Sequence, residues 1–456
     1  MSENVTKKSL LIYAHYYIPD TASTGQILSE LAEGLLAQFD VTVICVVPSY
    51  LGTVKNEYKQ KKIYRESLNG VKVIRIRVPE FTKTNKLSRI KNILSYFFNA
   101  MSATFKVGKM DYVLAVSQPP ILGGLLGVWG KWITHARFWN PQYYRKEFIE
   151  FGNRKDTEEA VTKKSCYIYW IQDANPEQIM AVGYFKFKPF LWLSKMLDIF
   201  SCLHADFVVV PARDMIETIE KRFTKHPKKM PKINVINNWI DEEKIYPLEP
   251  MHPSVVKFKK KYGLENKFII SYSGNLGQYY DLPNILKVIE KFPTGTKTSD
   301  GKDVIFIFIG NGTQKANMEN YVREHHMDNV RFIPYQNKDD LIYSLNAADV
   351  HWCVNAKGMK GVSCPSKYYG IAAVGKPVLG VLSEGSEIRT VIEKCGSGLC
   401  CKPEDYKGIE KNIKWFLDNA GNDNIRKMGE KGRTYLKANL SKDKGIERFI
   451  EILVEI

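Results

Sequence analysis

Short apolar runs alternate with stretches of helical spacing along most of the chain. In the first half, the apolar runs predict strands at 10–14, 41–47, 71–78, 112–116, 167–171, 207–210 and 233–236. In the second half they predict strands at 268–272, 304–309, 330–333, 350–354 and 377–381, with helical patterns between them, as at 282–291 and 339–347. This alternation is typical of βαβ units and therefore of parallel sheets in an α/β protein.

The alternation lapses once, between residues 236 and 255. This stretch carries Pro247, Pro250 and Pro253, and proline neither continues a helix nor sits in a central strand. We therefore predict two Rossmann-like domains joined by a linker. Their expected limits are 1–240, with a polar insert at about 135–165, then a linker at 241–256, a second domain at 257–441 and a C-terminal helix at 442–456.

Composition excludes several classes of protein. Of the 456 residues, 44% are hydrophobic and 25% are charged, which is close to a soluble globular average and excludes a disordered chain. No apolar run reaches the ~20 residues that span a bilayer, and the apolar stretch near the N-terminus is too short for a signal-peptide core. Eight cysteines occur without a CxxC pair, so we expect free thiols and no zinc site. These features predict a cytoplasmic protein.

Positive charge is concentrated in one segment. The formal net charge is +17, and residues 51–110 alone hold 14 Lys or Arg against 3 Asp or Glu. Such a block attracts nucleic acid, anionic lipid headgroups or phosphorylated substrates. The apolar segment 121–133 follows it, and either a buried core helix or a helix at a membrane interface fits that segment, with the core helix preferred.

A first candidate loop follows the first predicted strand. Ser23 and Gln26 fit a capping box at the start of a helix. The N-terminus of a helix offers free backbone N–H groups that suit an anion, and Gly25 permits close approach. An ordinary helix cap explains the same residues equally well.

A second candidate loop opens the second domain. The sequence from Ser273 to Gly277 includes Gly274 and Asn275, but it lacks the third glycine of G-x-G-x-x-G. No acidic residue ends the following strand, which argues against a dehydrogenase. A P-loop NTPase is also unsupported, because GxxxxGK[ST] is absent.

The densest constellation lies at residues 357–367. Lys357, Lys360 and Lys367 accompany Ser366 beside a predicted helix start. Lysine charges together with free N–H groups make a cradle for a diphosphate. Farther along, Glu387 opens another helix, where it either binds a ribose diol or acts only on the helix dipole.

Several segments in order resemble the retaining glycosyltransferases of family 4, which have the GT-B architecture. The chain is most similar to the branch that assembles lipopolysaccharide, colanic acid and capsule. The matching segments are TGQILSELAEGL, VTVICVVPSY, QDANPEQ, VINNWID, SGNLG, FIGNG, NVRFIPYQ, LNAADV and PSKYYGIAAVGKPVLGV. The segments are spread along both halves of the chain, and the resemblance extends over nearly its whole length.

The resemblance implies a metal-independent transfer without a cofactor, from a nucleotide-diphosphate sugar, most commonly a UDP-sugar, to a glycan or lipid-linked acceptor. The resemblance implies that Ser366 and Lys367 bind the donor diphosphate, assisted by Lys357 or Lys360. It places Gly274 and Asn275 in the donor pocket and Gly25 opposite the phosphates, across the cleft. It places Tyr335 and Gln336 near the nucleotide base. Asp173 corresponds to the family's polar residue near the transferred sugar, so Lys367 and Asp173 are the expected catalytic residues.

The chain also departs from the family pattern. The E-x7-E positions hold Val362 and Gly370, which leaves Glu387 as the candidate for ribose recognition. Three other functions remain open: a nucleotide-sugar epimerase of the same architecture, a non-catalytic subunit, and a nucleic-acid-binding protein. We expect no nucleic acid partner, because RRM, KH and zinc-finger signatures are absent. The basic block predicts an anionic partner surface, with the enzyme peripheral on the inner face of the plasma membrane.

Overall fold

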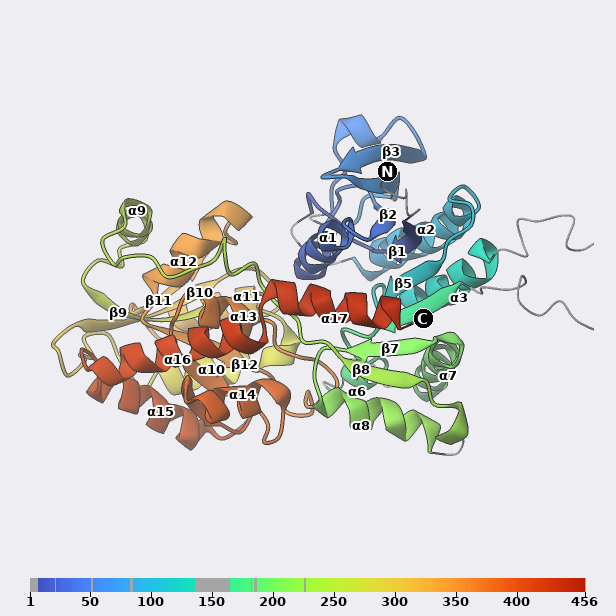
Figure 1. Cartoon of the computed structure of the whole chain (residues 1–456). Coiled ribbons are helices and arrows are strands. Elements are labelled where there is room, and N and C mark those ends of the chain that lie inside the picture. The colour runs from blue at the N-terminus through green and yellow to red at the C-terminus, as the bar shows by residue number, and fades with distance from the viewer. Residues whose placement is uncertain are drawn as a thin grey trace, which may run out of the picture.

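The computed structural model describes residues 7–20, 22–50, 52–82, 85–135, 165–181, 183, 187–224 and 227–455. Within these residues, two sheets form two lobes that lie side by side (Figure 1). Most of the insert predicted at 135–165, and Lys83 of the basic block, fall outside the described residues.

The N-terminal lobe is built on an eight-stranded sheet of order β3-β4-β2-β1-β5-β6-β7-β8. All neighbouring strands are parallel except β3 and β4. Its strands are β1 (Lys8–Tyr13), β2 (Phe39–Val46), β3 (Ile63–Leu68), β4 (Val71–Ile76), β5 (Tyr112–Val116), β6 (Cys166–Trp170), β7 (Phe207–Val210) and β8 (Lys232–Val235). Its helices are α1 (Ser23–Leu35), α2 (Lys86–Thr104), α3 (Leu122–Thr134), α6 (Glu177–Ala181), α7 (Lys188–His204) and α8 (Asp214–Glu220).

The C-terminal lobe is built on a six-stranded sheet of order β11-β10-β9-β12-β13-β14, parallel throughout. Its strands are β9 (Lys267–Ser273), β10 (Asp303–Ile309), β11 (Val330–Ile333), β12 (Val350–Val354), β13 (Val378–Val381) and β14 (Gly398–Cys401). Its helices are α9 (Pro253–Lys261), α10 (Leu282–Ile289), α11 (Lys315–Glu324), α12 (Leu341–Ala347), α13 (Lys367–Ala373), α14 (Glu387–Cys395), α15 (Tyr406–Asp418) and α16 (Asp423–Asn439). Helix α9 begins inside the predicted linker range, because proline is well tolerated in the first turn.

The last helix, α17 (Lys442–Val454), returns from the C-terminal lobe to pack against α1 (Figure 1). Phe449 of α17 inserts beside Trp170 of β6, with the ring centroids 4.8 Å apart. Phe449 and Leu453 are fully buried among the side chains of the N-terminal lobe. The C-terminal helix therefore ties the two lobes together through apolar burial.

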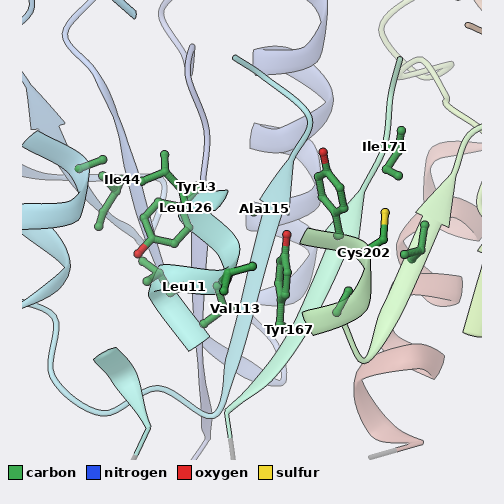
Figure 2. Close-up of a cluster of buried hydrophobic side chains, with 14 of the residues drawn as sticks. Leu11, Tyr13, Ile44, Val113, Ala115, Leu126, Tyr167, Ile171 and Cys202 are labelled. Atoms are coloured by element: carbon green, nitrogen blue, oxygen red, sulfur yellow. The ribbon is translucent and has the colours of Figure 1, made fainter. Parts of the chain in front are cut away.

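Apolar side chains cover both faces of the N-terminal sheet. Figure 2 shows one of these clusters, in which side chains of β1, β5 and β6 pack with Leu126 of α3 and Cys202 of α7. Eight residues of α3 are buried, so the segment 121–133 forms a core helix. This confirms the preferred prediction for that segment over a helix at a membrane interface. The eight cysteines are free thiols, as expected.

The predicted capping box at the start of α1 is wrong. Ser23 is already the first helical residue, and Ala22 is the N-cap, with no side-chain hydrogen bond to the first turn. The motif S-x-x-Q only caps a helix when its serine precedes the first turn, and here the helix begins one residue earlier. The sequence prediction also missed β3, the antiparallel edge strand, and β14.

Two features are absent from the part of the chain that the structure describes. None of its helices combines the length and apolarity needed to cross a bilayer. Nor do its His, Cys, Asp and Glu side chains gather in a group of three or more that could hold a metal ion.

Candidate functional site

A cleft of about 260 Å³ lies between the two lobes. The C-terminal ends of β9 and β10 and the segment from β11 to the start of α12 form one wall, and the segment after β1 with the first turn of α1 forms the other. Ligands of open parallel sheets bind at this edge of the strands. The lining residues are Ile18, Pro19, Asp20, Gln26, Ser273, Ile309, Tyr335, Gln336, Lys338, Asp339 and Leu341.

The turn after β9 brings Gly274 against Lys367. Gly274 has φ +147°, a conformation that favours glycine, and its N–H donates to the Ile309 carbonyl at 2.8 Å. A β-carbon added to Gly274 would lie 2.5 Å from Cε of Lys367. The backbone conformation therefore favours glycine here, and a β-carbon would displace the end of the Lys367 side chain from its present position.

Lys367 is the first residue of α13 and reaches back over two tyrosine rings. Its Nζ lies 3.8 Å from the ring centroid of Tyr280 and 5.2 Å from that of Tyr272. A cation over an aromatic face is attracted by the ring quadrupole, so the rings hold the half-buried ammonium beside Gly274. Burial raises the pKa of the Tyr272 hydroxyl well above its usual value, which keeps that ring neutral.

The other two predicted lysines lie elsewhere. Nζ of Lys357 forms an exposed ion pair with Glu404 at 2.7 Å. Lys360 is also exposed, and a β-carbon added to Gly385 would lie 2.9 Å from its Nζ. In this structure neither ammonium group lies with Lys367 at Gly274.

Asp173 follows β6 and lies where the N-terminal lobe meets the 357–367 segment. Residues Asp173 and Ser363 form an isolated antiparallel bridge, and the N–H of Ala174 donates to the Val362 carbonyl at 2.8 Å. The Gln178 amide donates to Oδ1 of Asp173 at 2.8 Å. Burial raises the pKa of the Asp173 carboxyl to about 6, against the lowering effect of the Gln178 hydrogen bond.

A buried ionic network supports the loop that carries Asp173. The Arg222 guanidinium pairs with Asp198 and with Glu177, the latter at 2.6 Å, and donates to the Asn175 carbonyl at 3.1 Å. Asp198 also accepts a hydrogen bond from the Tyr169 hydroxyl at 2.6 Å. Sequence reasoning missed this network, because its members come from four separate elements.

Glu387 is 5% exposed and contacts the N-terminal lobe. Its Oε2 accepts from the backbone N–H of Arg213 at 3.1 Å, and its Oε1 accepts from the Asn237 amide at 3.2 Å. The N–H groups of Glu387 and Gly361 in turn donate to the Asp214 carboxylate, at 3.1 and 2.8 Å. The two carboxylates therefore clasp the lobes together beside the 357–367 segment.

The remaining predicted residues occupy three different settings. Tyr335 and Gln336 line the cleft. Asn275 and Ser366 are exposed at the loop and at the start of α13. Gly25 is buried, and a β-carbon there would lie 2.9 Å from the Tyr16 carbonyl oxygen, so its glycine permits packing of α1 against the strand end.

The comparisons with known proteins agree with this geometry. Residues 255–435 match the family model "Glycosyl transferases group 1". This part of the chain is similar to the group 1 glycosyltransferases. The lobes have the GT-B fold, as the resemblance implied. The structure of HepE from Anabaena in complex with UDP-glucose superimposes with a TM-score of 0.64 at 12% identity, covering 98% of this chain and 100% of that chain.

Two curated relatives confirm the branch that the resemblance named. The probable glycosyltransferase WbjE of Pseudomonas aeruginosa is 26% identical over 288 residues, which are 62% of this chain and 66% of WbjE. The putative colanic acid biosynthesis glycosyl transferase WcaI of Escherichia coli K12 is 27% identical over 187 residues, 41% of this chain and 43% of WcaI. The match thus spans about two thirds of one relative and less than half of the other.

Proposed function

We propose that this protein is a glycosyltransferase that moves a sugar from a nucleotide-diphosphate donor, a UDP-sugar, to a glycan or lipid-linked acceptor of the cell envelope. The observation that carries the proposal is the contact between Lys367 and Gly274 beside the cleft between the lobes. The complex of HepE with UDP-glucose supports the choice of donor. In this proposal residues 257–441 bind the donor and residues 1–240 the acceptor.

The chemistry requires charge stabilisation at two places. Breaking the bond between sugar and diphosphate builds negative charge on the leaving group and positive charge at the sugar carbon. Lys367, held by the tyrosine rings, neutralises the departing diphosphate, with Ser366 and the N–H of Asn275 as further donors. Tyr335 and Gln336 receive the base, and Gly25 permits the N-terminal lobe to approach the phosphates.

Asp173 acts on the other side of the reaction. Its carboxylate lies at the junction between β6 and the 357–367 segment, where it stabilises the positive sugar carbon or orients the acceptor hydroxyl. We propose that the transfer retains the anomeric configuration and needs no metal ion, as in the family that the sequence resembles. Glu387 joins the donor site only if the lobes move, because its carboxylate accepts hydrogen bonds from the N-terminal lobe. Lys357 joins it only by leaving its ion pair with Glu404, and the exposed Lys360 only by turning toward it.

The proposed acceptor indicates where in the cell the enzyme works. An envelope glycan grows on a lipid carrier, so we propose that the enzyme works in the cytoplasm, peripherally on an anionic membrane surface. The basic block at 51–110 supports such an attachment.

A thermal-shift panel tests the donor. UDP-glucose, GDP-glucose and ADP-glucose are added separately to the full chain and to Lys367→Ala. A ligand at 100 times its Kd adds about 2.7 kcal/mol to stability, so we expect the UDP-sugar to raise the melting temperature of the wild type most strongly and that of the variant less. Stabilisation by no nucleotide sugar would refute the proposal, and conversion of the donor alone to an isomer would identify an epimerase instead.

A further inference from the structure

Helix α2 presents apolar side chains to solvent. Leu87, Ile90, Leu94 and Phe98 are spaced three and four residues apart and so share one face. They are 41–78% exposed, whereas Asn92, Tyr96, Ala100 and Ala103 on the opposite face are buried. A helix on the surface of a soluble protein normally carries polar residues on its outer face.

Helix α7 has the same inverted pattern. Its buried residues are Ser194, Asp198, Ser201 and Cys202. Beyond its first two residues, its exposed large side chains are apolar: Phe190, Trp192, Leu193, Met196, Phe200 and Leu203, with Trp192 66% exposed. The polar side of this helix thus faces the protein, and its apolar side faces outward.

Helix α3 joins these two surfaces into one. It packs against both α2 and α7, and the three helices lie on the same side of the N-terminal lobe in Figure 1. Phe105, just after α2, lies against Trp129 of α3 with the ring centroids 5.7 Å apart. Trp132 of α3 is half exposed, and its ring centroid lies 6.2 Å from that of Phe200 of α7. We call the exposed side chains of α2 and α7, together with Trp132, the apolar face.

The exposed charged side chains of α2 and α7 are all basic, and the acidic partners beside them, Asp206 and Glu177, are paired with Lys131 and Lys195. Helix α2 contains Lys86, Arg89 and Lys91 and no acidic residue. In α7 the only acidic residue is Asp198, which is buried and paired with Arg222. A second copy of this chain would bring like charges together, whereas an anionic bilayer offers both complementary charge and an apolar interior.

We propose that the apolar face of α2, α3 and α7 inserts into the interfacial layer of an anionic lipid bilayer. The proposal deepens the proposed function, on which it rests for its purpose, by naming the surface that brings the enzyme to a lipid-linked acceptor. The segment 121–133 is mostly buried and contributes only Trp132, so α2 and α7 supply most of the inserting side chains. Tryptophan and phenylalanine side chains anchor at the headgroup level, and the lysines bind the headgroups.

Vesicle flotation tests this surface. The full chain is mixed with vesicles of phosphatidylglycerol and phosphatidylethanolamine, or with vesicles of phosphatidylcholine alone. We compare the wild type with the triple variant Phe98→Ser, Trp192→Ser, Leu193→Ser and with the control Met251→Ser, which removes an 80% exposed apolar side chain outside this face. We expect binding to the anionic vesicles only, weakened at least about tenfold by the triple variant and unchanged by the control.

Three results would overturn the proposal. One is flotation of the triple variant like the wild type, and another is failure of the wild type to float. The third is a wild-type dimer in solution that the triple variant converts to a monomer, since the face would then bind a second copy. Stabilisation by UDP-glucose is measured on the same samples, so that loss of membrane binding is distinguished from misfolding and from failure of the proposed donor site.

Discussion

Replacing Asp173 with asparagine should make the protein more stable while it lowers turnover. Burial raises the pKa of this carboxyl from 3.8 to about 6. The folded state therefore disfavours the ionised form, and the cost is fully present above pH 6 and absent below about pH 3.8. Asparagine carries no charge, and its carbonyl oxygen can still accept the hydrogen bond from Gln178.

The size of the effect follows from the shift. Two pKa units correspond to about 3 kcal/mol of unfolding free energy at pH 8. At pH 5 the folded carboxyl is mostly protonated, and linkage leaves about half of that gain. For a lobe of this size, 1 kcal/mol moves the melting temperature by about 2–4 °C, so Asp173→Asn should melt roughly 6–12 °C above the wild type at pH 8 and about half as far above it at pH 5.

Differential scanning calorimetry at the two pH values checks this prediction. The control is Asp418→Asn, which neutralises an exposed carboxylate on α15 and should change stability by no more than about 0.5 kcal/mol. A variant no more stable than the wild type at pH 8, or a gain of equal size at both pH values, would show that the carboxylate is not held in a desolvating environment.

Three further substitutions test the site. Lys367→Ala should lower turnover about 10²-fold or more at saturating donor, because it removes a preorganised charge; near-normal turnover would exclude that role. Gly274→Ala should weaken the binding of UDP, measured by calorimetry, at least about tenfold, since the new β-carbon meets Lys367. The control Gly295→Ala also changes a glycine with a positive φ, but it has open space around it and should leave the affinity unchanged. Equal affinities of the two variants would contradict the steric argument. Glu387→Gln replaces an acceptor of two N–H groups with an amide, so X-ray scattering should report a larger radius of gyration; an unchanged radius with weaker UDP binding would point to the ribose instead.

Sequence patterns were sufficient for the alternation of strands and helices and for the two-sheet architecture. The central strands of both lobes, such as β1, β5, β9 and β12, are buried apolar runs, and a run of this kind is recognisable in the sequence. Two motifs that lie far apart in the chain predicted that Lys367 and Gly274 belong to one pocket. The sequence did not predict that the two residues contact each other. The edge strand β3 was missed because its residues are only partly buried and its sequence, IYRESL, lacks a continuous apolar run.

Other features depend on tertiary contacts that a linear pattern does not contain. Glu387 opens a helix as predicted, but its partners Arg213 and Asn237 belong to the other lobe. The rings of Tyr272 and Tyr280 under Lys367 are visible only when α13 lies against the turn after β9. The spacing of apolar residues in α7 predicts an amphipathic helix, yet it does not reveal that the apolar side faces outward.

A crystal structure of the protein with UDP-glucose tests the proposed donor site most directly. We expect the diphosphate in the cleft between the lobes, with an oxygen within hydrogen-bonding distance of Nζ of Lys367 and the phosphates against the backbone at Gly274. A nucleotide bound at another place, or a Lys367 ammonium that turns into solvent while the nucleotide occupies the cleft, would contradict the role assigned to that lysine.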